Sequence, residues 1–141
     1  MSGHVTTPPR HTRVVTFGTF DVFHAGHLHL LERAAALGDE LLVGVSSDEL
    51  NIAKKGRQPV YRLEDRMAIL GALRCVDGVF VERSLEAKRA HLVEHRADVL
   101  VMGDDWSGRF DELSDICRVV YLPRTPAVST TAIIEQIRAV V

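Results

Sequence analysis

The stretch VVTFGTFDVFHAGH at residues 14–27 decides the fold class of this chain. It opens with the apolar and β-branched run Val14–Phe17, which is typical of a buried strand. The turn-like segment Gly18–Asp21 follows, and from about His27 the apolar residues recur at helical spacing. A strand that passes through a short turn into a helix is the opening unit of an α/β domain.

The alternation of strands and helices continues along the chain. Apolar strands without polar alternation indicate a parallel sheet that is covered on both faces. We therefore predict an α/β fold: a single Rossmann-like domain at residues 13–141, with a five-stranded parallel sheet and helices on both faces, after a flexible lead-in at residues 1–12. Gly38 is predicted to end the first helix in a left-handed cap. The predicted strands are 14–17, 41–45, 78–81, 99–102 and 119–122; the predicted helices are about 27–37, 63–73, 85–95 and 130–141, and residues 46–59 are predicted to form a polar connection.

The composition of the 141 residues narrows the class of function. Hydrophobic residues make up 46% and charged residues 26%, as in a globular domain, and no apolar run approaches the roughly 18–20 residues of a membrane span. The 17 Lys and Arg against 19 Asp and Glu give a net charge of −2, which argues against a chain-wide surface for nucleic acid. Cys75 and Cys117 make no disulfide framework. We expect a cytoplasmic protein with no membrane insertion and no nucleic-acid partner.

The loop after the first predicted strand is the first candidate site, because ligands of a parallel sheet gather beyond the carboxyl ends of its strands. This loop carries neither a dinucleotide glycine fingerprint nor a P-loop lysine. It places His24 and His27 at the start of a helix, where free N–H groups and the helix dipole attract anions. Gly26 lets a phosphate approach the backbone, so we predict nucleotide binding with both histidines donating to phosphate oxygens.

Two other interpretations of this loop stay open at the level of the residues. The histidines can be ordinary polar residues at a helix start, or they can bind zinc with His29 as a third ligand. A structural zinc site would need closed tetrahedral ligation, and neither Cys75 nor Cys117 stands in a ligand-like pair.

The residues of this loop and of later segments carry a family resemblance. Gly18-Thr19-Phe20-Asp21 followed by His24-Ala25-Gly26-His27 resembles the signature of the nucleotidylyltransferase superfamily, especially the cytidylyltransferases. Over about residues 13–138 the chain resembles the bacterial glycerol-3-phosphate cytidylyltransferases more specifically. The segments that carry this are Val101–Trp106 (VMGDDW), Gly108–Asp111 (GRFD), Leu122–Thr125 (LPRT) and Ser129–Thr131 (STT).

The resemblance implies a reaction and its partners. CTP and sn-glycerol 3-phosphate would give CDP-glycerol and pyrophosphate, with Mg²⁺ as cofactor, in a homodimer whose product feeds teichoic-acid or related polymers. The phosphate of the acceptor is itself the nucleophile, so the enzyme needs to supply only positioning and charge stabilisation. The lack of a catalytic triad in this sequence agrees with that chemistry.

The resemblance also implies roles for single residues around the nucleotide. His24, His27, Arg66 and Arg124 form the implied catalytic set, in which His27 leads in stabilising the transition state and Arg66 supports the site. Ser129 and Thr130 at the start of the last helix would hold the β- and γ-phosphates. The implied nucleotide-binding residues are Thr19, Phe20, His24, Ala25, Gly26, His27, Arg74, Asp105, Arg124, Thr125, Pro126, Ala127, Val128, Ser129, Thr130 and Thr131.

Charged residues that follow other strands match the acceptor side of the family site. Lys54 and Lys88 match positions that touch the acceptor phosphate, with Lys55 as a substitute for Lys54 and a solvated surface position as the alternative for Lys88. Asp105 is expected to coordinate Mg²⁺ or to hold a nucleotide hydroxyl. Trp106 is expected to be a packing anchor.

Some residues depart from the family pattern or stand beside it. Pro126-Ala127 replaces an acidic residue and a glycine, and alanine lacks the freedom of glycine at positive φ. Leu85 stands where the family can carry tryptophan. Asp21 is expected to organise its loop, since a bare carboxylate would repel phosphate, and His29 is expected to face solvent or to pack.

Three alternatives to the implied reaction stay open. The acceptor can be another polyol phosphate, phosphocholine or phosphoethanolamine, or ATP can replace CTP as the nucleotide. From a different class, the chain can be a nucleotide-binding regulatory module that keeps the fold without turnover; it would bind CTP and release no pyrophosphate.

Overall fold

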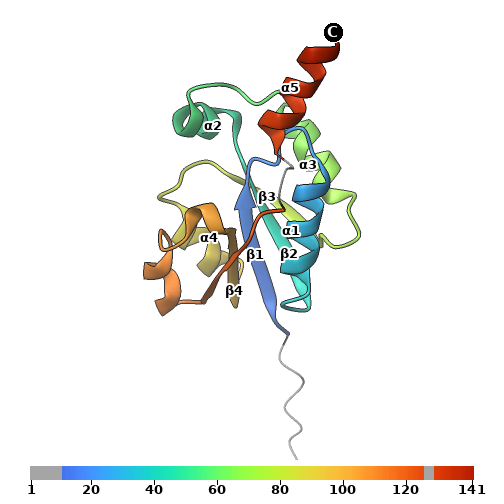
Figure 1. Cartoon of the computed structure of the whole chain (residues 1–141). Helices are drawn as coiled ribbons and strands as arrows, with labels where there is room; N and C mark the ends of the chain where they lie inside the picture. Colours follow the sequence, from blue (N-terminus) through green and yellow to red (C-terminus); the bar gives the residue numbers. More distant parts are fainter. Residues whose placement is uncertain (1–10, 126–128) are drawn as a thin grey trace, which may run out of the picture.

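The computed structural model describes residues 11–125 and 129–141. Its five parallel strands lie in the order β3-β2-β1-β4-β5, so β1 stands at the centre (Figure 1). The prediction of a five-stranded parallel sheet with helices on both faces is confirmed. The strands are β1 (Arg13–Gly18), β2 (Glu40–Ser46), β3 (Gly78–Glu82), β4 (Val99–Gly103) and β5 (Arg118–Leu122).

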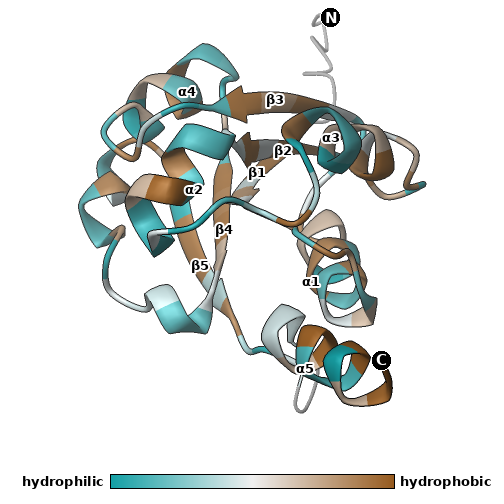
Figure 2. Cartoon of the chain, turned by 90° about the horizontal axis from the view of Figure 1, so that it is seen from above, coloured by the Kyte–Doolittle hydropathy of each residue, from teal (hydrophilic) through white to brown (hydrophobic). Residues whose placement is uncertain are grey.

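Alternate residues of the central strands pack into two separate hydrophobic cores, one on each face of the sheet. Val14 of β1 packs with the apolar faces of the helices α1 (Ala25–Ala35) and α3 (Leu63–Gly71). Its neighbour Val15 points to the opposite core, beneath the helix α4 (Lys88–Glu94). Figure 2 shows α1 and α3 on one side of the sheet and α4 on the other. Because both faces are covered, the strands are largely apolar on both sides, as the sequence indicated.

The remaining elements lie beyond the carboxyl ends of the strands. The helices α2 (Asp48–Lys55) and α5 (Thr130–Val140) stand there in Figure 1, and α5 lies beside α1 in Figure 2. Two short 3₁₀ helices, η1 (Asp104–Trp106) and η2 (Asp111–Asp115), follow β4. Among the described residues, no helix is long and apolar enough to cross a bilayer.

Two details of the prediction are wrong. Part of the polar connection at 46–59 is the helix α2, which is capped by the Ser47 hydroxyl at its start and by Gly56 at φ 73° at its end. The first helix ends at Ala35 without a left-handed glycine. Gly38 serves a close approach instead, since a Cβ there would stand 2.7 Å from the Thr12 carbonyl oxygen.

Two further predictions concern the flexible lead-in at residues 1–12 and the two cysteines. Residues 1–10 lie outside the described part of the chain, and Thr12 is already held to the sheet, since its N–H donates to the Asp39 carboxylate at 2.7 Å. Cys75 and Cys117 are both free thiols, as expected from their number and spacing.

Candidate functional site

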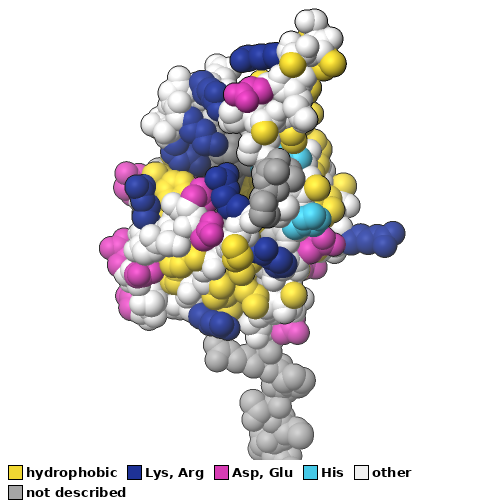
Figure 3. All heavy atoms as spheres, viewed as in Figure 1, with side chains coloured by type: hydrophobic (Ala, Val, Ile, Leu, Met, Phe, Trp, Pro, Cys, Tyr) yellow, Lys and Arg dark blue, Asp and Glu magenta, His cyan; other side chains and the backbone are white. Residues whose placement is uncertain are grey.

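The candidate site lies where the strand order of the sheet reverses, between β1 and β4. Chain connections leave β1 and β4 toward opposite faces, and a crevice opens between the carboxyl ends of these two strands. A cavity of about 620 Å³ occupies it, with walls from the β1–α1 loop, α2, η1 and the start of α5. Its lining includes Lys55, Arg57, Arg124 and Arg138, and Figure 3 shows Lys and Arg side chains gathered around the hollow on this face. The cavity is therefore suited to a polyanion of nucleotide size.

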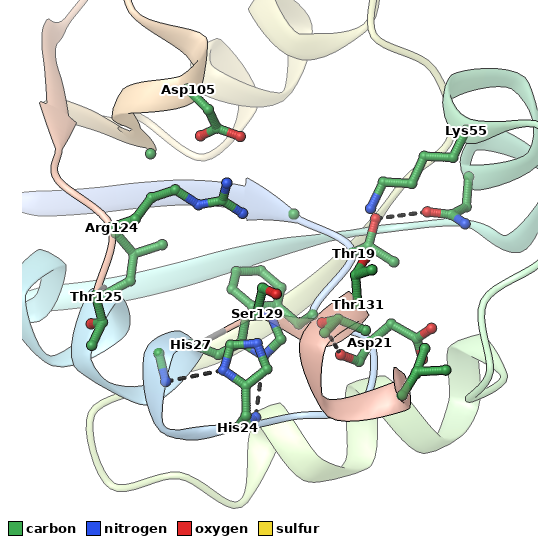
Figure 4. Close-up of a pocket in the computed structure, with 18 of the residues that line it drawn as sticks. Thr19, Asp21, His24, His27, Lys55, Asp105, Arg124, Thr125, Ser129 and Thr131 are labelled. Carbon is green, nitrogen blue, oxygen red and sulfur yellow. Dashed lines mark hydrogen bonds between the residues drawn. The ribbon is translucent and has the colours of Figure 1, made fainter. Parts of the chain in front are cut away.

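His24 and His27 are oriented by the backbone at the start of α1. The Nδ1 atom of His24 accepts from the Gly26 N–H at 3.0 Å, and Nδ1 of His27 accepts from the His24 N–H at 3.3 Å. The two rings stack with their centroids 3.7 Å apart (Figure 4). Because Nδ1 is an acceptor in both rings, the proton of each neutral imidazole is on Nε2.

The protonation state of the pair follows from burial and from nearby cations. Burial, with help from His24, Lys55 and Arg124, lowers the pKa of His27 to about 3. Burial and Arg124 also lower the pKa of His24. His27 is thus neutral at physiological pH, and its Nε2–H can donate to an anion without a change in protonation state.

Asp21 organises the β1–α1 loop, as the sequence indicated. Its carboxylate accepts from the N–H groups of Val60 at 2.7 Å and Tyr61 at 2.8 Å, and so it ties the loop to the segment before α3. Phe20 and Val22 on either side have φ of 53° and 47°, a strained conformation for side chains of this kind. The contacts of Asp21 hold this strained turn in place: both oxygens of its carboxylate accept backbone N–H groups at the edge of the cavity, which Asp21 lines.

The connection from β5 to α5 closes the cavity from the other side. The Ser129 hydroxyl caps α5 by accepting from the Ala132 N–H at 3.1 Å, and the Thr130 hydroxyl donates to the Asp21 carbonyl at 2.9 Å. Arg124 follows β5 and reaches into the space between the histidines and Asp105 (Figure 4). The last helix therefore presents its N-terminus beside the N-terminus of α1.

Arg66 does not lie where the catalytic assignment requires. It is 1% exposed and lines neither cavity. Its guanidinium donates to the carbonyls of Thr19, Ser46 and Tyr61 at 2.8–3.0 Å and pairs with Asp48 at 2.7 Å. A guanidinium with these partners cannot contact a ligand, so Arg66 is a positioning residue that joins three connections of the site.

A second, smaller cavity of about 130 Å³ adjoins the first. The two cavities share a wall made of Phe17, Gly18, Thr19, Lys55, Met102, Asp105 and Trp106. Lys54 and Lys88 both line the smaller cavity, and the surface alternative for Lys88 is wrong because this side chain is 3% exposed. Its neighbour Arg89 takes the solvent position, where it pairs with Asp115 at 3.0 Å.

The three lysines of the smaller cavity differ in their surroundings. Lys54 is half-buried and donates to the Ser46 hydroxyl at 2.8 Å, and burial lowers its pKa to about 8 against the opposing effect of Glu82. Burial likewise lowers the pKa of Lys88, and the buried Glu82 carboxylate, at 2.5 Å, opposes this. Lys55 lines both cavities. Lys54 and Lys55 thus both line the smaller cavity, and either ammonium can approach an anion there.

Most of the predicted nucleotide-binding residues meet in the larger cavity. Ala25 is exposed at the helix start and does not line it, and Arg74 is exposed near the amino-terminal edge of the sheet, beside Asp77, whose N–H donates to the Leu41 carbonyl. Arg74 therefore does not reach the cavity of its own chain. Pro126, Ala127 and Val128 lie outside the described residues. The residues brought together are Thr19, Phe20, His24, Gly26, His27, Asp105, Arg124, Thr125, Ser129, Thr130 and Thr131.

Several residues of the site were not found from the sequence. Asn51 is 2% exposed, accepts from the Thr19 hydroxyl at 2.8 Å and donates to the Arg57 carbonyl at 3.0 Å. It therefore links α2 to the β1–α1 loop at the cavity wall. Arg57, Gln58 and Arg138 also line the cavity. Recognising α2 as a helix would have placed Asn51 one turn before Lys54 and Lys55, on the same side of the site.

The cavity offers few metal ligands among the residues that the structure describes. His24, His27 and His29 are not brought together as a zinc site, and His29 instead approaches the Thr125 hydroxyl at 3.4 Å. Asp105 lies on the wall between the two cavities, and its carboxylate is of the kind that could hold Mg²⁺. In the described residues, the only group of three possible ligands within 4.8 Å of one another is His91, Glu94 and His95 at the carboxyl end of α4, and none of the three lines either cavity.

The chain was compared with known proteins. The sequence profile of the cytidylyltransferase-like family matches residues 15–136. The chain is 50% identical over 125 residues to the glycerol-3-phosphate cytidylyltransferase of Bacillus subtilis (strain 168), covering 89% of this chain and 96% of that protein. It is 36% identical over 138 residues to the FAD synthase of Pyrococcus horikoshii, covering 91% and 93% of the two proteins.

A solved structure agrees with the fold. The lipopolysaccharide core biosynthesis protein from Thermoplasma volcanium GSS1 superposes with a TM-score of 0.69 over 82% of this chain and 99% of that one, at 24% identity. Both the profile and the sequence relatives span nearly all of the domain that carries the two adjoining cavities. The family implied by the paired histidines is thus confirmed, and the chain belongs to the cytidylyltransferase-like family.

Proposed function

We propose that this protein is a glycerol-3-phosphate cytidylyltransferase, which makes CDP-glycerol and pyrophosphate from CTP and sn-glycerol 3-phosphate. One observation carries the proposal: a nucleotide-sized cavity with neutral imidazole donors shares a wall with a small cavity lined by three lysines. Two anions can therefore be bound side by side. The relative with 50% identity bears the name of this activity and matches over 96% of its own length.

The chemistry is a displacement at phosphorus. A phosphate oxygen of the acceptor attacks the α-phosphorus of CTP, a P–O bond forms, and the bond from the α-phosphorus to the oxygen shared with the β-phosphate breaks. Pyrophosphate leaves with that oxygen. The acceptor phosphate carries about −1.5 to −2 charge near neutrality, so no general base is needed. The task of the protein is to align two anions and to neutralise the charge that spreads over the transferring group.

The residues divide this task between the two cavities. His24 and His27 donate from Nε2 to the phosphates of CTP, while Arg124 and the capped start of α5 hold the departing pyrophosphate. Lys54 and Lys55 draw in the acceptor phosphate. Mg²⁺, held mainly by the phosphates of CTP with Asp105 as the carboxylate at the wall, would supply further charge neutralisation.

The low pKa of Lys54 predicts that kcat/KM for the acceptor depends on pH. A lysine with a pKa of about 8 loses its charge as the pH rises through that value. The acceptor phosphate, with a second pKa of about 6, is already fully ionised there. We expect kcat/KM for the acceptor to fall about tenfold per pH unit above pH 8 in the wild type, and Lys54→Arg, which stays charged, to remove this fall. A pH profile at saturating CTP measures it, and an unchanged profile in the variant would assign the effect to another group.

The test of the proposed function is pyrophosphate release with Mg²⁺. CTP and ATP are each combined with sn-glycerol 3-phosphate, its enantiomer, phosphocholine and phosphoethanolamine. We expect release with CTP and sn-glycerol 3-phosphate alone. Release with ATP would favour an adenylyltransferase, and CTP binding with no release in any well would favour a regulatory module.

Two further expectations belong to this proposal. The homodimer rests on the family resemblance, and sedimentation of the purified protein, with and without CTP, tests it. A role in supplying teichoic-acid or related polymers rests on the same resemblance. A gene-deletion strain that still makes CDP-glycerol at the wild-type level would contradict that role.

A further inference from the structure

The ammonium of Lys88 lies inside a cage of aromatic rings and one carboxylate. Its Nζ atom is 3.9 Å from the ring centroid of Phe17 and 5.1 Å from that of Phe110. Glu82, 1% exposed, holds it at 2.5 Å from the side. Trp106 also lines this small cavity and packs against Phe110 with the centroids 5.5 Å apart. Phe17, Phe110 and Glu82 thus surround a single positive charge that belongs to the protein itself, with Trp106 behind Phe110.

Such a cage is a receptor for organic cations. The faces of aromatic rings attract ammonium groups, most strongly where water is excluded, and a carboxylate adds a full opposite charge. Quaternary ammonium head groups are bound in other proteins by this combination of groups. A cavity with these walls and no internal cation would favour an acceptor with a choline-like or ethanolamine-like head.

The geometry points to a role for Lys88 in acceptor choice. We propose that the Lys88 side chain itself occupies this cage, so that it excludes phosphorylated amino alcohols and leaves the pocket selective for phosphates of uncharged polyols. This inference rests on the proposed function, because it concerns the acceptor of that reaction. Lys88 is then a specificity-determining residue, whatever contact it also makes with the acceptor phosphate.

The charge balance of the pocket supports this role. Lys88 neutralises Glu82, so the positive charges of Lys54 and Lys55 remain available to the acceptor phosphate. Without Lys88, the buried carboxylate would face the aromatic rings unpaired, a state that costs free energy until another cation enters. Discrimination against a cationic head therefore comes from steric exclusion and charge repulsion by one side chain.

A binding experiment without turnover tests the proposal. Trp106 is the one tryptophan of the chain and lines the cage, so its fluorescence reports on occupancy. We expect choline to leave the fluorescence of the wild type unchanged and to change that of Lys88→Ala in a saturable way. The uncharged isostere of choline, 3,3-dimethylbutanol, should bind this variant about tenfold more weakly or not at all, since it lacks the cation–π and carboxylate attraction.

Control variants separate the cage from general effects. Arg89→Ala removes the adjacent exposed cation and should behave like the wild type. Lys88→Ala combined with Glu82→Gln should lose at least about tenfold in choline affinity relative to Lys88→Ala alone, because the carboxylate charge is gone. Choline binding to the wild type, or equal binding of choline and its isostere to Lys88→Ala, would overturn the proposal.

A milder variant keeps the test valid if Lys88→Ala does not fold. Lys88→Gln preserves most of the packing and removes the charge. We expect the ratio of kcat/KM for sn-glycerol 3-phosphate to that for phosphocholine to fall by about tenfold or more in this variant. An unchanged ratio would contradict the role of Lys88. Failure of the proposed function is a different result, namely no turnover of either acceptor by the wild type.

Discussion

Replacing His27 with alanine is expected to lower kcat by about 10²–10³-fold, as the loss of one preorganised donor to a developing charge does in other enzymes. The imidazole of His27 is oriented by the His24 N–H and kept neutral by a pKa of about 3. Its Nε2–H is therefore ready to donate before the charge moves to the transferring phosphate. Steady-state rates of pyrophosphate release at saturating CTP and acceptor measure the effect.

The protonation argument makes this prediction more specific. Since His27 of the ligand-free protein stays neutral down to a pH of about 3, kcat/KM for CTP should show no inflection near pH 6.5 that the variant removes. His11→Ala, at an exposed histidine bound to Glu40 and remote from the cavity, serves as the matched control. A His27→Ala protein that folds and keeps a near-wild-type rate would exclude His27 from the mechanism.

Arg66→Met is expected to lower the free energy of unfolding by about 3–5 kcal/mol, because two buried carbonyl groups lose their donor, at about 1–3 kcal/mol each, and the partly exposed Asp48 loses its ion pair. Methionine keeps most of the packing volume but leaves the Thr19 and Ser46 carbonyls and the Asp48 carboxylate without the guanidinium. Urea denaturation followed by circular dichroism measures the loss. Because Thr19 starts the β1–α1 loop, we also expect weaker binding of CTP.

A neighbouring arginine provides the control for Arg66. Arg62 is largely exposed, with Glu64 and Asp65 at 3.6–3.7 Å, so Arg62→Met should change the free energy of unfolding by less than about 0.5 kcal/mol. Equal stability of the two variants would show that the network around Arg66 contributes nothing. A stable Arg66→Met protein with lost turnover but normal CTP affinity would return Arg66 to a direct role.

The fold could be predicted because its signals are local and repeated. Apolar strands followed by helical periodicity define the parallel sheet, and the connections determine its handedness. The helix α2 was missed although Ser47 before it, Asp48 and Glu49 at its start, and Gly56 after it are complete helix-boundary signals. Its eight residues bury only Leu50 and Asn51, so the hydrophobic periodicity that carried the other helices is weak there.

The candidate site was predictable to the level of its loops but not of its contacts. Spacing alone placed His24 and His27 at a helix start, and the resemblance identified Lys54 and Lys88. Sequence spacing does not tell which arginine faces inward: Arg66 is buried against carbonyl groups while Arg74 lies near the far edge of the sheet. The role of Asn51 depends on a contact between α2 and the first loop, which is visible only in three dimensions.

The hydrogen bond from Thr130 to Asp21 joins residues that are 109 positions apart. The ribosome makes the histidine loop well before the helix that completes the cavity. A nascent chain can assemble β1 to β4 around their core while its nucleotide site still lacks the start of α5. Capture of CTP is thereby postponed until the start of α5 has been made, and chains truncated before Ser129 should neither bind the nucleotide tightly nor be protected by it from proteolysis.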